Sequence, residues 1–304
     1  MPSFEPLRIA LFAAAAGLAA PAAAQNALLT PAEYSAQAKS LLMTSIGFRT
    51  VEHGGQITAY AEHIAGVLKA AGFSASDVEI TPMGDTATLV AYLRGEGREK
   101  PLLLSGHMDV VEARPEDWER DPFVAVEENG YIYGRGATDN KFGVSMMVVT
   151  LARLKKEGFK PKRDVVLVLS GDEETHMAPT KALAERFADA GLVLNSDGGG
   201  GLLGEDGEAV AYYLQGAEKT YADYRVEFVN PGGHSSMPRA DNAIYSLTRA
   251  LDRIARRRFP VQWSEITLGF FRETGAKTQG PVGEAMRRFA ENPKDKGAIR
   301  ILRE

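Results

Sequence analysis

Short apolar runs alternate with helix-patterned segments through the middle of the chain, and this alternation constrains the fold most strongly. Three apolar runs read as strands: LLLSG at 102–106, VVLVLS at 165–170 and LVLN at 192–195. Apolar residues at helical spacing fill 143–157 and 180–190 between these runs. Strands that alternate with helices form largely parallel sheets whose strands read as continuous apolar segments. We therefore predict an α/β fold with a mixed, largely parallel central sheet and flanking helices.

The pattern changes towards the C-terminus, where we expect a second, smaller domain. TYADYRVEFV (220–229) alternates as a half-exposed strand does, residues 244–254 repeat at helical spacing, and VQWSEITLGFF (261–271) resembles another strand. These three segments predict an α+β domain in the order β-α-β. We place the first domain at 25–212 and the smaller domain at 213–304.

The N-terminus has the pattern of a cleavable leader. Arg8 precedes the apolar run IALFAAAAGLAAPAAA, and the small residues Ala22 and Ala24 precede polar sequence from Gln25. The run is too short and too rich in alanine for a stable membrane span, which needs about 20 apolar residues. We therefore expect residues 1–24 to be a signal peptide, cleaved after Ala24, and the protein to be periplasmic or secreted.

Charge and cysteine content narrow the classes of partner and metal site. The chain has 35 Lys and Arg against 40 Asp and Glu, a formal net charge of −5, so it lacks the basic field that binds nucleic acids. The chain has no cysteine, so histidine and carboxylate side chains must hold any metal ion.

Acidic and imidazole side chains follow the predicted strands or precede the helix between them. These residues are His107, Asp109, Asp139, Glu173, Glu174 and Asp197. The carboxyl ends of strands in an open α/β sheet face one crevice, so we expect these groups to converge there. Clustered carboxylates repel one another unless a cation neutralises them. One histidine among several carboxylates suits zinc, with cobalt or manganese as substitutes, and the number of carboxylates suffices for two ions that share an aspartate.

Five motifs carry a resemblance to a known family. HMDVV, GRGATDNKFG, GDEE, NSDGG and NPGGHSSMP occur in the order and spacing of the di-zinc exopeptidase and deacylase family. That family contains glutamate carboxypeptidase, aminoacylase, acetylornithine deacetylase and succinyl-diaminopimelate desuccinylase. The resemblance extends from about Leu28 to the last residue, and it implies a zinc-exopeptidase-like first domain with a lid and dimerisation domain.

The resemblance implies a ligand set for two zinc ions in each complete subunit. His107 and Asp197 would hold one ion, Glu174 would hold the other, and Asp139 would bridge them. Asp109 would orient the imidazole of His107. The peptide bond after Asp139 is often cis in the family.

The resemblance also implies catalytic roles. Glu173 would be the general base that activates water, and His234 would reach the active site of the neighbouring subunit of a homodimer to steady the oxyanion. His176 matches no family ligand, so we interpret it as structural. The implied reaction is hydrolysis of an amide next to a free carboxylate, in a dipeptide, a C-terminal residue or an N-acyl amino acid.

The sequence departs from the family at its C-terminal end. Family members continue further and supply one more histidine to the second zinc, whereas no histidine follows His234 here. We therefore expect a truncated member whose catalytic and lid domains are both incomplete. The alternative is a non-catalytic metal-binding or peptide-binding protein with an incomplete site, although such a protein would not need a base at Glu173.

Overall fold

The computed structural model describes residues 31–304, which form two compact units divided after Gly199. The predicted leader lies outside the described residues, and the domain boundary expected between residues 212 and 213 stays a prediction. No helix among the described residues is long and apolar enough to cross a membrane.

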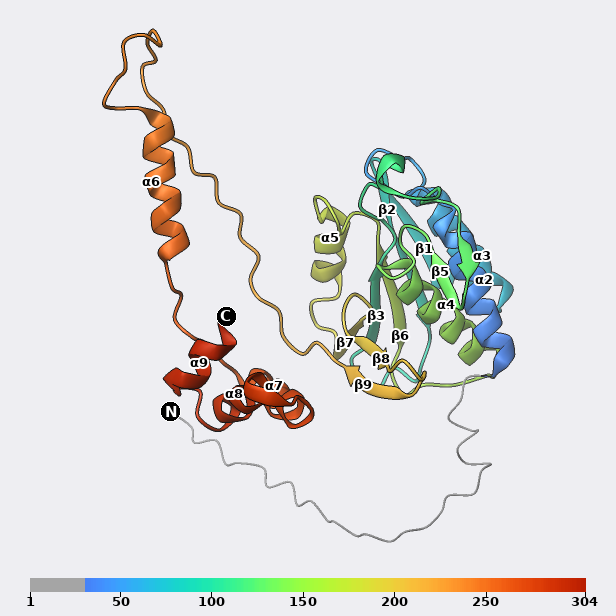
Figure 1. Cartoon of the computed structure of the whole chain (residues 1–304). Helices are drawn as coiled ribbons and strands as arrows, with labels where there is room; N and C mark the ends of the chain where they lie inside the picture. Colours follow the sequence, from blue (N-terminus) through green and yellow to red (C-terminus); the bar gives the residue numbers. More distant parts are fainter. Residues whose placement is uncertain (1–30) are drawn as a thin grey trace, which may run out of the picture. The chain divides into compact units, whose positions relative to one another are not determined.

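A five-stranded mixed sheet forms the centre of the first unit (Figure 1). β3 pairs in parallel with β6 and β7, whereas β2 pairs antiparallel with β1 and β6. The mixed sheet predicted from the sequence is therefore confirmed. In sheet order the strands are β1 (Val78–Met83), β2 (Thr86–Leu93), β6 (Val165–Ser170), β3 (Leu102–His107) and β7 (Leu192–Asn195).

Helices flank the sheet on both faces. Figure 1 shows α2, α3 and α4 on one face and α5 on the other. β6 is buried from both sides, because Leu167 and Leu169 join the core beneath the three helices while Val166 and Val168 join a smaller core with α5. This double burial explains why VVLVLS is continuously apolar. The helices are α2 (Ala32–Ile46), α3 (Ile57–Ala70), α4 (Lys141–Lys156) and α5 (Ala178–Arg186).

The parallel register determines where the strand ends lie. His107, the last residue of β3, is level with Ser170 at the end of β6, and Ser105 is level with Asn195 at the end of β7. The residues that follow these strands therefore emerge at one edge of the sheet. Two 3-10 turns (Ala75–Asp77 and Pro115–Asp117) and the hairpin of β4 (Val126–Glu128) with β5 (Tyr131–Tyr133) complete the first unit.

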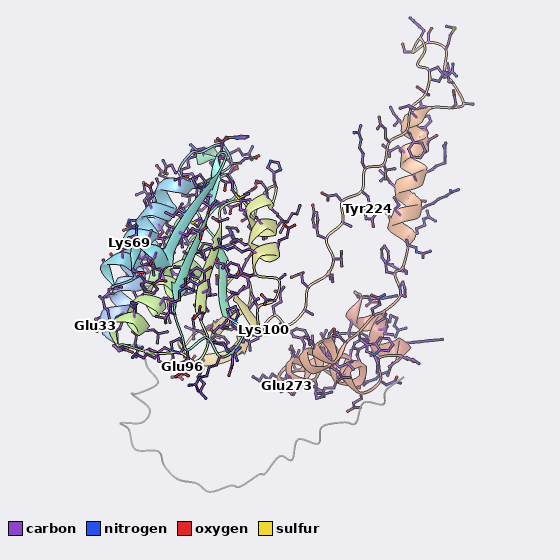
Figure 2. All side chains as sticks on the ribbon, turned by 180° about the vertical axis from the view of Figure 1, so that it is seen from behind. Glu33, Lys69, Glu96, Lys100, Tyr224 and Glu273 are labelled. Carbon is purple, nitrogen blue, oxygen red and sulfur yellow. The ribbon has the colours of Figure 1, made fainter. Side chains whose placement is uncertain are left out.

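The second unit contains a hairpin, a long irregular segment and four helices. Residues 214–242 are described and contain neither helix nor strand, and Tyr224 within them is exposed (Figure 2). Phe271 of α7 packs edge to face on Phe289 of α8 in a small core. The elements are β8 (Gly200–Leu203), β9 (Ala209–Tyr213), α6 (Ala243–Arg256), α7 (Glu265–Lys277), α8 (Gly280–Glu291) and α9 (Lys296–Leu302).

Two strands predicted in this unit do not form. The segment 220–229 has no strand partner in the described chain, and a strand without a partner leaves its backbone groups unpaired. The segment 261–271 becomes helical from Glu265, because Ser264 accepts a hydrogen bond from the amide of Thr267 and caps a helix there. The predicted helix at 244–254 is confirmed as α6.

Candidate metal centre

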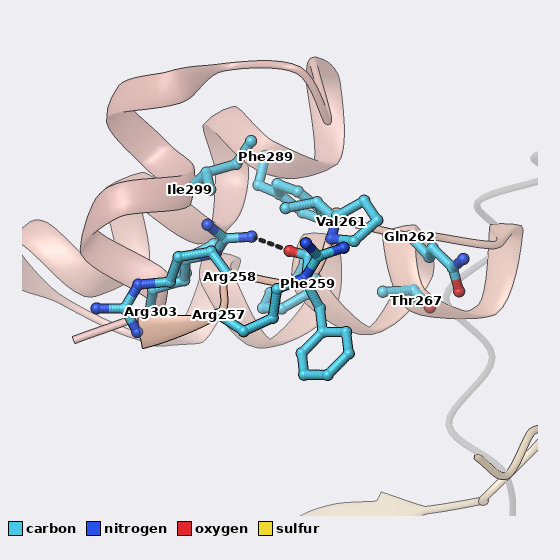
Figure 3. Close-up of a pocket in the computed structure, with 12 residues that line it drawn as sticks. Arg257, Arg258, Phe259, Val261, Gln262, Thr267, Phe289, Ile299 and Arg303 are labelled. Atoms are coloured by element: carbon cyan, nitrogen blue, oxygen red, sulfur yellow. Dashed lines mark hydrogen bonds between the residues drawn. The ribbon is translucent and has the colours of Figure 1, made fainter. Parts of the chain in front are cut away.

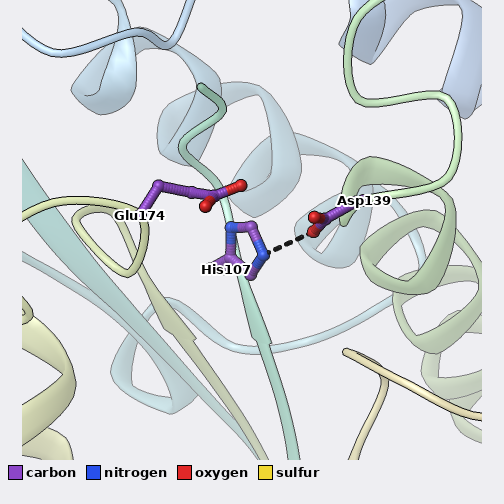
Figure 4. Close-up of side chains that lie close together, drawn as sticks. All are labelled: His107, Asp139 and Glu174. Carbon is purple, nitrogen blue, oxygen red and sulfur yellow. Dashed lines mark hydrogen bonds and ion pairs between the residues drawn. The ribbon is translucent and has the colours of Figure 1, made fainter. Parts of the chain in front are cut away.

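The imidazole of His107 lies at the middle of the predicted site. His107 ends β3 and is buried, with Nε2 2.9 Å from Oδ1 of Asp139 and 3.6 Å from Oδ2 of Asp197. Asp139 lies just ahead of α4, and Asp197 follows β7. Three segments that are distant in the sequence thus bring their polar side chains to one edge of the sheet. Figure 4 shows His107 with Asp139 and with Glu174.

Both glutamates after β6 face the same imidazole. His107, Asp139 and Glu174 form one group of possible ligand atoms that lie within 4.8 Å of one another, and His107, Glu173 and Asp197 form another. The structure therefore brings together all five of these side chains. Since each glutamate belongs to a possible ligand group, the division into Glu174 as ligand and Glu173 as base stays a prediction.

Asp109 supports the two glutamates in a way that the sequence did not predict. Its buried carboxylate accepts hydrogen bonds from the backbone N–H of Glu173 (3.0 Å) and of Glu174 (2.9 Å). The ring Nδ1 of His107 donates to the backbone carbonyl of Asp109 at 3.0 Å, while the carboxylate Oδ1 is 3.5 Å away. The backbone carbonyl of Asp109 thus holds the imidazole, and its carboxylate fixes the turn that carries both glutamates; the orienting role expected for the carboxylate stays a prediction.

The charges of the site favour a cation. Burial alone would lower the pKa of His107, but Asp109, Asp139 and Asp197 outweigh it and raise this pKa to about 9. Burial, reinforced by the neighbouring carboxylates, raises the pKa of Glu173 above its ordinary value. Without a metal, a proton on the imidazole is the cation that the carboxylates stabilise.

Two further carboxyls show the same repulsion. Burial first, and then the charge of Asp139, raises the pKa of Glu174, and burial together with Asp139 and Asp109 raises the pKa of Asp197. A divalent ion would relieve this repulsion more fully than one proton does. One imidazole with hard carboxylate oxygens and no thiolate is a donor set that zinc accepts, so the residues fit the expected metal.

Among the polar residues near Asp139, Lys141 stabilises the fold around the site. Lys141 is fully buried at the start of α4, and its Nζ donates to the backbone carbonyls of Ser45 (2.9 Å) and Phe48 (2.5 Å) at the C-terminal end of α2. Burial lowers the pKa of this lysine to about 7. The peptide bond between Asp139 and Asn140 is cis, as the resemblance implied.

The remaining histidines lie outside these ligand groups. His176 Nε2 is 3.0 Å from Oε1 of Glu52, and both residues line a cavity of about 280 Å³ next to Asp109. His234 belongs to the second unit, where it is exposed and its Nδ1 lies 2.8 Å from Oγ of Ser236. The role of His234 in a neighbouring subunit stays a prediction.

A larger cavity, of about 440 Å³, lies in the second unit (Figure 3). Arginines and apolar side chains line it, and no carboxylate or imidazole is among its described lining residues. This lining offers no metal ligand and no acid-base group. The chemistry predicted from the sequence therefore belongs to the edge of the sheet in the first unit.

Comparison with known proteins places this site in a family. Residues 103–296 match the model of peptidase family M20/M25/M40. The chain belongs to this metallopeptidase family. It is 28% identical over 277 residues to mouse N-fatty-acyl-amino acid synthase/hydrolase PM20D1, covering 86% of this chain and 55% of the mouse protein. It is 36% identical over 149 residues to carboxypeptidase S of Saccharomyces cerevisiae, covering 46% of this chain and 26% of the yeast protein.

Further M20 relatives match about half of the chain. A probable succinyl-diaminopimelate desuccinylase of Staphylococcus aureus is 36% identical over 167 residues, which are 53% of this chain and 38% of that protein. The structure of human carnosine dipeptidase 1 matches with a TM-score of 0.48 and 21% identity, over 55% of this chain and 40% of that one. The chain thus spans between 26% and 55% of the length of the three relatives compared by sequence.

Proposed function

We propose that the protein is an exported, zinc-dependent hydrolase that cleaves an amide or peptide bond next to a free carboxylate. The observation that carries the proposal is the pair Glu173 and Glu174, held by Asp109 so that both face the imidazole of His107. A site that only bound metal would need ligands alone, whereas this site has a carboxylate to spare for proton transfer. Membership of the M20 family supports hydrolysis of peptide or acyl-amino-acid bonds.

The side chains at the edge of the sheet divide into ligands and a base. His107 and Asp197 would hold one zinc, Glu174 the other, and Asp139 would contact both. Bound zinc polarises the scissile carbonyl and acidifies water. This division follows the family resemblance and is consistent with the two groups of atoms around His107.

Glu173 is the residue to which we assign proton transfer. It takes a proton from the attacking water and delivers that proton to the leaving amine, as a positioned general base does. Its partly buried environment, which raises the pKa of its carboxyl, suits a group that must accept a proton and release it again. We further propose that His234 acts in the partner of a homodimer formed through the lid domain.

The substrate class is a small peptide or an N-acyl amino acid. Relatives named carboxypeptidase and N-fatty-acyl-amino acid synthase/hydrolase support this class. The leader, cleaved after Ala24, would place the reaction in the periplasm or outside the cell.

The variant Glu173→Gln tests the proposal. We expect dialysed protein to keep its zinc while dipeptide or N-acetyl-amino-acid hydrolysis falls by about two orders of magnitude or more, the scale of losing a positioned acid-base group. Glu185→Gln, an exposed change on α5, is the matched control and should leave both measurements unchanged. Equal loss of zinc and turnover in Glu173→Gln would show that base and ligand are interchanged. Wild-type protein that holds zinc but hydrolyses no amide would favour the non-catalytic alternative.

A further inference from the structure

Two residues that adjoin predicted ligands meet behind the metal centre. Asn140 follows Asp139 and Ser196 precedes Asp197, and Oγ of Ser196 donates a hydrogen bond to Oδ1 of Asn140 at 2.7 Å. Asn140 is only 1% exposed, so a lost partner could not be replaced freely by solvent. We call this contact the Asn140–Ser196 clasp.

The clasp lies in a slot that two glycines keep open. A Cβ on Gly106, which precedes His107, would lie 2.9 Å from both Oδ1 of Asn140 and Oγ of Ser196. A Cβ on Gly143 would lie 2.4 Å from Cβ and Oγ of Ser196. Both distances are shorter than side-chain carbons tolerate, so only glycine at these two positions leaves room for the hydrogen bond.

The segments that the clasp joins are not adjacent in the sheet ladder. Asp139 comes from the loop before α4, which packs on a face of the sheet, whereas Asp197 follows β7, the edge strand that pairs only with β3 within residues 31–304. The two carboxylates repel each other across His107, and their side chains are 58% and 34% exposed, so burial does not fix them.

We propose that the Asn140–Ser196 clasp positions Asp139 and Asp197 on either side of the imidazole of His107, each in its own group of possible ligand atoms. Asn140 and Ser196 are thus positioning residues that touch neither metal nor substrate. The inference rests on the proposed metal centre and adds the device that holds two of its ligands in place. Deleting a group that orients a metal ligand typically lowers metal affinity by a factor of about 10 to 100.

The test compares Ser196→Ala with Ser145→Ala in the full chain. Ser145 lies on α4, is 1% exposed, and its Oγ has no hydrogen-bond partner among the described residues, so its replacement removes a buried hydroxyl without touching the clasp. Zinc affinity is measured by competition with a chromophoric chelator, and the visible spectrum of the Co²⁺-loaded protein reports ligand geometry. We expect Ser196→Ala to weaken zinc binding by about 10-fold or more and to change the cobalt spectrum, with Ser145→Ala like wild type on both.

Gly143→Ala provides a second variant that keeps every polar group. Alanine is favoured over glycine within a helix, so α4 is not weakened, but the new methyl group must displace Ser196. We expect the same direction of change in zinc affinity and in the cobalt spectrum. Wild-type affinity and an unchanged spectrum in both Ser196→Ala and Gly143→Ala would overturn the clasp while the metal centre stands. A wild-type protein that binds no zinc would overturn both.

Discussion

Replacing Asp109 by asparagine should release the turn that carries the two glutamates. The carboxylate of Asp109 accepts the amide of Glu173 with one oxygen and the amide of Glu174 with the other. Asparagine offers one oxygen and one NH₂ group, so one of the two amides must face a donor instead of an acceptor. The variant keeps the size of the side chain and leaves the backbone carbonyl that holds His107 in place.

The magnitude follows from the charge on the acceptor. A hydrogen bond to a charged group contributes about 1.5–3 kcal/mol, and 1.4 kcal/mol corresponds to a factor of ten in an equilibrium. Burial alone would raise the pKa of Asp109, but its hydrogen bonds with His107 and the two amides hold this pKa below its ordinary range, so the carboxylate is ionised at neutral pH. Loss of one bond should therefore speed hydrogen exchange of the released amide by about 10- to 100-fold.

The measurement is residue-resolved amide hydrogen exchange on the metal-free protein. The amide of His176, in the same turn, donates to Oδ1 of Asp172 at 2.9 Å and serves as an internal control. Asp109→Asn should accelerate exchange at Glu173 or Glu174 and leave the His176 amide protected. Asp172→Ala, which removes the acceptor of the His176 amide, should do the reverse. Unchanged protection of both glutamate amides in Asp109→Asn, or equal release of all three amides, would refute the assignment of this turn to Asp109.

Three further outcomes follow from the site and the leader. Against the effect of burial, the neighbouring carboxylates raise the pKa of His107 to about 9, so below that pH zinc must displace a proton from its imidazole. Zinc affinity should therefore increase about 100-fold between about pH 6.5 and about pH 8.5, and a flat profile in a competition titration would contradict this. His107 is the one imidazole in both described ligand groups, so a second ion would be held only by carboxylates and easily lost. Dialysed protein should therefore keep about one zinc per chain. Metal analysis that finds two tightly held ions would disprove this expectation. Intact mass of exported protein should give a mature chain that starts at Gln25, and a soluble product that retains Met1 would rule out export.

The sheet, and the positions of the polar residues that gather at its edge, could be predicted because both follow from burial. A strand that is buried on two faces must be apolar throughout, and the first polar residue after it marks where the strand leaves the core. This reasoning places His107 after LLLSG and Glu173 after VVLVLS, and the parallel register of β3 with β6 brings the two strand ends to one edge. β1 was missed because VEITPM lacks a continuous apolar run. α2 was missed although its buried residues Tyr34, Ala38, Leu41 and Leu42 stand at helical spacing, because small and polar residues separate them.

The second unit shows where sequence patterns fail. Alternation in 220–229 records the preference of each residue for a half-buried strand, but a strand also requires a partner, which lies elsewhere in the sequence. For 261–271 two local patterns compete, since VQW favours a strand while Ser264 followed by Glu265 favours the start of a helix. The segment is helical in the structure from Glu265, and Phe271 packs on Phe289 there.

Ligands and the residues that support them differ in how visibly the sequence marks them. Asp139 is largely exposed, and its place beside the buried imidazole of His107, rather than its charge alone, marks it as a possible ligand. Asp109 and Asn140 are buried, and short polar residues of this kind are equally common in ordinary turns. A buried polar group must find its partners inside the protein, and here those partners are backbone amides and a hydroxyl on segments more than 50 residues away. Asp109 and Asn140 can therefore be recognised as supporting residues only once the structure shows which segments they connect. In the structure they are the buried polar residues that adjoin the predicted ligands.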